Sequence, residues 1–180
     1  MKNLMPLALI LFSTACGSLP SQSEHAADIA VANKQYNRIM SLVGDWFLVD
    51  GNQLGQVIEV EQGQPFITYE ISSAGNSVVE KLFAGQEKEM TTVYYMDDGA
   101  LSLAHYCSLG NRPYMTEASS QDGNISFELV RVENMLDAND VHISSHSIEF
   151  LGENEMIAHW SSTKDQKPNK SSAFRVMRNP

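Results

Sequence analysis

Beyond Trp46, apolar and polar residues alternate with the two-residue period of β-strands. Short runs rich in Val, Ile, Tyr, Phe and Thr are separated by turn residues, with no helical pattern between them. Roughly ten such runs predict an antiparallel sandwich or barrel, and short hairpins between consecutive strands favour the barrel. We expect a basic, Pro-containing loop at 163–171. The expected strands cover residues 46–50, 56–62, 66–72, 77–83, 89–96, 100–107, 114–120, 125–133, 141–150, 155–162 and 172–178.

The segment before the strands has a different period. From about Glu24 to Val43, apolar residues recur at steps of three and four, which places them on one helical face. Ser21 or Ser23 can cap the start of this helix, and Gly44 can end it. We expect the helix to cover an open end of the sheet; a partner-binding helix is the alternative. The face comprises Ile29, Ala32, Tyr36, Ile39, Met40 and Val43. The predicted fold class is all-β: an antiparallel barrel of about 8–10 strands preceded by one N-terminal helix.

The dipeptide Asp98-Gly99 predicts the register of one hairpin. Both central positions of a type I′ turn need positive φ, and this dipeptide is a strong signal for that turn. Because side chains alternate along a strand, counting outward places one set of residues on a single face, and its large apolar groups predict that this face is the interior. The cross-strand pairs of this set are Met96 with Leu101, Tyr94 with Leu103, Thr92 with His105, and Met90 with Cys107.

The inward-facing His105 has two interpretations. It is either a core histidine held by a hydrogen bond to Thr92 or Tyr94, or the polar group that orients a ligand in an apolar cavity. The neighbouring Tyr106 is expected to point outward or toward a neighbouring loop. We interpret Cys107 as a free core thiol, a poor nucleophile because burial raises its pKa. The candidate ligand-binding residues are His105, Tyr94, Thr92, Leu103 and Tyr114.

A second polar cluster lies between residues 141 and 160. A tight turn centred on Gly152-Glu153 would pair His146 directly with His159, on a face shared with His142. This cross-strand pair could share a metal ion, but zinc usually takes three or four protein ligands and no nearby residue completes the set. The alternative is a polar, Ser-rich sheet surface or a hydrated patch inside the cavity.

Motifs of common enzyme classes do not occur in the sequence. It has no G-x-S-x-G nucleophile elbow, no H-E-x-x-H and no Walker-type glycine-rich loop. The only catalytic candidate is His105, as an acid or base beside Tyr94 or Tyr114. The formal net charge of −10 argues against nucleic acid as a partner and against electrostatic adhesion to anionic lipid.

The N-terminal residues predict secretion. Lys2 is followed by an apolar run to Phe12, too short to span a bilayer but typical of a secretory signal. Cys16 follows the small residues Ser13 and Ala15, and this stretch resembles the lipobox of bacterial lipoproteins, in which the cysteine is lipidated. Ordinary secretion without lipidation is the alternative. We expect a signal peptide at 1–15, a flexible tether at 16–23 and one domain at 24–180, in a periplasm-facing protein that touches the membrane only through its lipid anchor.

Two motifs resemble known families. Gly44 and Trp46, which open the first strand, resemble the G-x-W signature of lipocalins and related calycins. In that superfamily an arginine of the last strand packs over the tryptophan, a role that Arg175 or Arg178 would fill. The stretch 105–115 is similar to an H-Y-C-x-x-G-N-x-P-x-M motif in bacterial secreted, lipocalin-like proteins of unassigned function. The resemblance implies a calycin-like barrel and no particular activity.

From these observations we expect a secreted barrel that binds a small apolar or amphipathic molecule. The first alternative is an enzyme that uses the same cavity with His105 as acid or base. The second is haem binding with His105 or His159 as axial ligand, non-covalent because no C-x-x-C-H motif is present. The third is a structural or interaction role without any ligand.

Overall fold

The computed structural model describes residues 32–61, 63–121 and 123–178. The expected signal peptide at 1–15, the tether at 16–23, the lipidated Cys16 and the first part of the predicted helix lie outside these residues. Within them, one helix covers residues 32–40 and is followed by β-strands.

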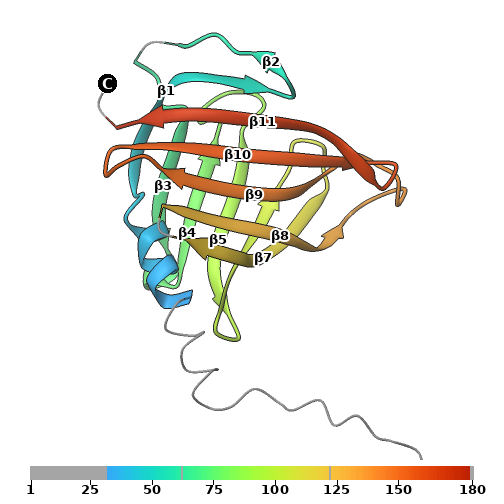
Figure 1. Cartoon of the computed structure of the whole chain (residues 1–180), viewed down its shortest axis with the longest axis horizontal. Helices are drawn as coiled ribbons and strands as arrows, with labels where there is room; N and C mark the ends of the chain where they lie inside the picture. Colours follow the sequence, from blue (N-terminus) through green and yellow to red (C-terminus); the bar gives the residue numbers. More distant parts are fainter. Residues whose placement is uncertain (1–31, 62, 122, 179–180) are drawn as a thin grey trace, which may run out of the picture.

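Ten antiparallel strands close into a barrel, so the predicted all-β fold class is confirmed (Figure 1). The sheet order is β11-β10-β9-β8-β7-β6-β5-β4-β3-β1-β2, and pairing of β11 with β1 closes it. The short β2 pairs only with the end of β1. This architecture is consistent with a lipocalin-like fold. The elements are β1 (Gly44–Gln53), β2 (Gln56–Val57), β3 (Ile67–Ser72), η1 (Ser73–Gly75), β4 (Ser77–Leu82), β5 (Met90–Asp97), β6 (Ala100–Tyr106), β7 (Arg112–Gln121), β8 (Asn124–Glu133), β9 (His142–Phe150), β10 (Glu155–Lys164) and β11 (Lys167–Met177).

The helix covers one end of the barrel, as predicted. Figure 1 shows it, in blue, beside the ends of β3 and β4, and the Tyr36 hydroxyl donates to the Gly75 carbonyl at 2.9 Å. Ile39 is fully buried in the barrel core. The predicted contact of Val43 is wrong, because the helix ends at residue 40 and the following turn buries Leu42 instead.

Trp46 closes the same end of the barrel. Its indole is buried, and Nε1 donates to the Leu42 carbonyl at 2.7 Å. Of the two arginines considered, Arg178 lies over the indole, with its guanidinium carbon 4.6 Å from the ring centroid. Arg175 bonds Glu155 at 2.6 Å. The tryptophan–arginine contact implied by the calycin resemblance is therefore present, through Arg178.

The Asp98-Gly99 hairpin has the predicted register. Both turn residues have positive φ, 48° and 86°. Thr92 pairs with His105 and Tyr94 with Leu103, and all four side chains are buried in the interior. Tyr106 is exposed, as predicted.

Two other connections differ from prediction. Leu151 N donates to the Glu155 carbonyl, so the hairpin pairing continues one residue past Phe150 and leaves a three-residue loop at 152–154. In this register His146 pairs with Trp160. This shift of one residue exchanges the two faces of the strand. The expected loop at 163–171 instead continues the ladder around a two-residue turn at Asp165-Gln166.

Two further local features explain why Pro168 is accepted within β11 and why the second strand is short. Pro168 is tolerated because this part of β11 extends beyond its pairing with β1 and so forms a free edge, where no donor is needed. The predicted strand at 56–62 forms a ladder only at Gln56–Val57, where it pairs with the end of β1.

Candidate ligand-binding cavity

A cavity of about 440 Å³ lies within the barrel. Its lining comes from strand ends and from the connections β1–β2, β4–β5, β6–β7 and β8–β9, at the end opposite the helix. The volume lies within the usual range of small-molecule sites. The apolar wall is formed by Leu82, Phe83, Met90, Ile143, Trp160 and Phe174. The cavity is thus apolar inside, while the exposed Lys164 and Lys170 lie at its mouth.

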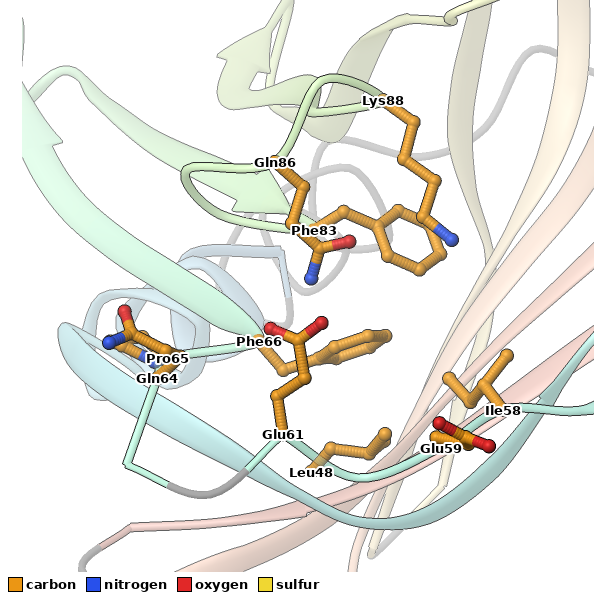
Figure 2. A pocket seen from close by; sticks show the side chains of 10 residues that line it. All are labelled: Leu48, Ile58, Glu59, Glu61, Gln64, Pro65, Phe66, Phe83, Gln86 and Lys88. Carbon is orange, nitrogen blue, oxygen red and sulfur yellow. The ribbon is translucent and has the colours of Figure 1, made fainter.

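A smaller pocket of about 210 Å³ adjoins this cavity on the other side of an aromatic cluster. The rings of Phe66, Phe83 and Phe174 pack with centroids 4.9–5.6 Å apart, and Phe83 lines both spaces. Figure 2 shows Lys88 on one side of this pocket and Glu61 on the other. Its polar, loop-built lining makes it a weaker candidate for an apolar ligand than the larger cavity.

His105 is the most informative residue of the larger cavity. Its side chain is 1% exposed, and Nδ1 lies 3.0 Å from Thr92 Oγ1. The other ring nitrogen, Nε2, has no hydrogen-bond partner among the described residues. Burial lowers the pKa of His105 to about 4, so the ring is neutral at neutral pH. A buried polar atom without a partner is unusual and marks a place where a ligand or water could bind.

Trp160 provides a second unpartnered atom beside His105. The two rings have centroids 4.6 Å apart, both residues line the cavity, and no described group accepts from Trp160 Nε1. On its other side Trp160 stacks on His146, with centroids 3.7 Å apart. An apolar cavity whose wall includes two adjacent rings, each with an unpartnered nitrogen, can orient a small molecule.

A buried polar network lies behind His105. Tyr94 Oη lies 2.7 Å from Glu80 Oε2 and 3.0 Å from His146 Nε2, while Thr92 Oγ1 lies 3.2 Å from Glu80 Oε1. Burial raises the pKa of Glu80 and lowers that of His146 to about 3. Glu80 was not predicted as a site residue, although it shares the inner face of β4 with Val78 and Leu82. Tyr94 and Thr92, predicted as ligand-binding residues, are engaged in this network.

The remaining predicted ligand residues divide between the two faces of the barrel. Leu103 is fully buried in the core. Tyr114 pairs with Ala104 on the outer face, where its hydroxyl donates to Glu133 at 3.2 Å. Its predicted position beside His105 is therefore wrong.

The predicted histidine pair is also absent. His146 faces the interior, whereas His159 is partly exposed and its Nε2 lies 3.6 Å from Glu149. Trp160 pairs with His146 and both are buried, and adjacent side chains of a strand point to opposite faces, so His159 points outward. The two histidine rings therefore cannot share an ion. The outward direction of His159 also removes it as a haem ligand in the cavity. Among the described residues, no group of three or more His, Cys, Asp or Glu side chains could hold a metal ion.

The H-Y-C-x-x-G-N-x-P-x-M stretch builds one side of the cavity mouth. Gly110 has φ +86° in the β6–β7 turn, a conformation that favours glycine. Asn111 Nδ2 donates to the Val141 carbonyl at 2.8 Å, which links this turn to the β8–β9 connection. Cys107 and Val141 both line the cavity, and Cys107 is a free, half-buried thiol whose pKa is raised by burial. Gly110 and Asn111 therefore have structural roles around the opening.

Comparisons with known proteins provide no family. Neither the family models searched nor the curated proteins contain a match to this chain. Among the described residues, no helix is long and apolar enough to cross a membrane.

Proposed function

We propose that this protein binds a small apolar or amphipathic molecule in the cavity lined by His105. The main support is one observation: the apolar cavity of about 440 Å³ is lined by His105 and Trp160, and each of these rings carries a buried nitrogen without a hydrogen-bond partner among the described residues. A site of this composition holds a ligand by apolar contact and orients it by a few polar groups. Lys164 and Lys170 at the mouth favour an amphipathic ligand whose outer end is anionic.

A fluorescent amphipathic anion tests this proposal. We expect 1-anilinonaphthalene-8-sulfonate to bind the folded protein with enhanced fluorescence, and nonan-1-ol to displace it. Ile143→Trp places a larger side chain in the cavity wall and should weaken binding by about tenfold or more, equivalent to about 1.4 kcal/mol. Val130→Trp, at an exposed position on β8, is the matched control and should bind like the wild type.

The outcomes separate binding in the cavity from binding at the surface. If the probe does not bind, or if the two variants bind it equally well, the proposal is wrong. Thermal unfolding of both variants checks that each is folded. Absorbance of the purified protein near the Soret band would instead indicate that the occupant is haem, with His105 as the available ligand.

We further propose that the protein belongs to the bacterial secreted, lipocalin-like proteins that carry the H-Y-C-x-x-G-N-x-P-x-M motif, and that it is anchored in the cell envelope through Cys16. The motif spacing and the Trp46–Arg178 contact support the first statement. The apolar run before Cys16 supports the second. Cys16→Ser should release the protein from the membrane fraction, and the wild-type mass should include the acyl groups. A soluble, unmodified wild-type product would contradict the anchor.

A further inference from the structure

Five polar contacts, four of them buried, form one continuous chain behind the cavity wall. It starts at the His159 carbonyl, which lies 2.9 Å from His146 Nδ1, and continues from His146 Nε2 to Tyr94 Oη at 3.0 Å. Tyr94 Oη contacts Glu80 Oε2 at 2.7 Å. Glu80 Oε1 contacts Thr92 Oγ1 at 3.2 Å, and Thr92 Oγ1 contacts His105 Nδ1 at 3.0 Å. Each contact needs one hydrogen, so the positions of the hydrogens can be deduced from the fixed end.

The first two hydrogens are determined by the His159 carbonyl. A carbonyl oxygen only accepts, so His146 must donate from Nδ1. A neutral imidazole carries one hydrogen, so His146 Nε2 is an acceptor, and the Tyr94 hydroxyl must donate to it. The neutral form of His146 agrees with its burial, which lowers its pKa to about 3.

The hydrogen between Tyr94 and Glu80 must then come from Glu80. With the Tyr94 hydrogen directed to His146, the 2.7 Å contact between Tyr94 Oη and Glu80 Oε2 holds a hydrogen only if Glu80 is a carboxylic acid. The surroundings agree with a neutral Glu80, because it is buried, its pKa is raised by burial, and no ion pair to it is found among the described residues.

The same logic reaches His105. Glu80 Oε1 has no hydrogen, so Thr92 donates to it, and the Thr92 oxygen can only accept from His105 Nδ1. His105 therefore carries its hydrogen on Nδ1 and leaves a lone pair on Nε2. Moving the Glu80 proton along the chain to His146 would give an ion pair, but Oε1 would still accept from Thr92, so the tautomer of His105 would not change.

We propose that this chain makes His105 Nε2 an acceptor on a ring that lines the cavity, and that the site selects ligands whose buried end is a hydroxyl or amide group. A hydroxyl or amide group can donate to His105 Nε2, whereas an ether oxygen can only accept. A carboxylate would place its lone pairs against that of Nε2. This inference rests on the proposed binding function and specifies the chemical class of ligand.

The tautomer is measurable without any ligand. Long-range ¹H–¹⁵N spectra of the histidine rings should show His105 protonated at Nδ1 and unprotonated at Nε2, with the signal assigned by its loss in His105→Phe. Glu80→Gln keeps one donor and one acceptor in the positions of the carboxylic acid, so the tautomer should persist. A His105 ring protonated at Nε2, in the wild type or in Glu80→Gln, would overturn the inference.

The ligand class is tested with two isomers, nonan-1-ol and 1-methoxyoctane, which contain the same atoms. We expect the alcohol to bind about 2- to 13-fold more tightly, the effect of one neutral hydrogen bond, and the preference to disappear in His105→Phe. Equal binding of both isomers to the wild type would overturn the inference and leave the binding function intact; a water that satisfies both rings would give this result. Failure of both isomers to bind would contradict the binding function itself.

Discussion

The protein should lose stability as the pH falls below about 6.5. Two histidines that stay neutral in the folded core take up protons when the chain unfolds, and low pH favours that uptake. His105 and His146 are buried, and burial lowers their pKa values to about 4 and about 3. In the unfolded chain each would have its ordinary pKa of about 6.5. Between these values the unfolded state binds protons that the folded state does not, so the free energy of unfolding decreases as the pH decreases.

The magnitude follows from the size of the pH interval. One pH unit changes the free energy of unfolding by about 1.4 kcal/mol for each proton taken up on unfolding. Between about pH 6.5 and pH 5, His105 and His146 therefore each remove about 1.6 kcal/mol, or about 3 kcal/mol together. Glu80 acts in the opposite direction: burial raises its folded pKa, so its contribution to stability is present at low pH and is lost as the pH rises.

Urea unfolding followed by circular dichroism at about pH 7.5, 6 and 5 measures this dependence. The variant His105→Gln removes one of the two protons, so the slope of stability against pH should decrease by about 1.4 kcal/mol per unit below pH 6. The comparison is between slopes, so the lower overall stability of the variant does not affect it. An unchanged slope in His105→Gln would refute the assignment of a neutral, buried His105.

The other predictions concern the closed end of the barrel and the thiol in the cavity. Trp46→Ala should destabilise the protein by about 3–5 kcal/mol in urea unfolding, the usual cost of deleting a large buried aromatic side chain, and a cost near zero would contradict its role at the closed end. Cys107, measured in a Cys16→Ser background, should react slowly with N-ethylmaleimide at pH 7 and faster as the pH rises, because burial raises its pKa. Bound nonan-1-ol should slow the reaction further, and an unchanged rate would show that the ligand does not occupy the space beside the thiol.

The fold was predictable because its signals are local. Alternating apolar residues located the strands, and Asp98-Gly99 determined the register that places His105 inside, since few residues other than these adopt both positive φ angles readily. Gly152 gave no such constraint. A three-residue loop is as compatible with its sequence as a two-residue turn, and the difference decided whether His146 or His159 faces the core.

The polar network was predicted only in part. The sequence indicated Thr92 beside His105, because one hairpin contains both residues. Glu80 and His146 reach this site from β4 and β9, and side-chain contacts across the barrel interior depend on its closure and shear rather than on any short-range pattern. Tyr114 was misplaced for the related reason that its direction depends on the length of the β6–β7 turn.

The most direct test of the central claim is native mass spectrometry of the protein purified gently from its native host. We expect a population whose mass exceeds that of the same protein after denaturation by one small organic molecule. Ile143→Trp should reduce that population and Val130→Trp should not. A wild-type protein that is always empty, and that also fails to bind nonan-1-ol, would contradict the claim that the cavity lined by His105 and Trp160 is a ligand-binding site.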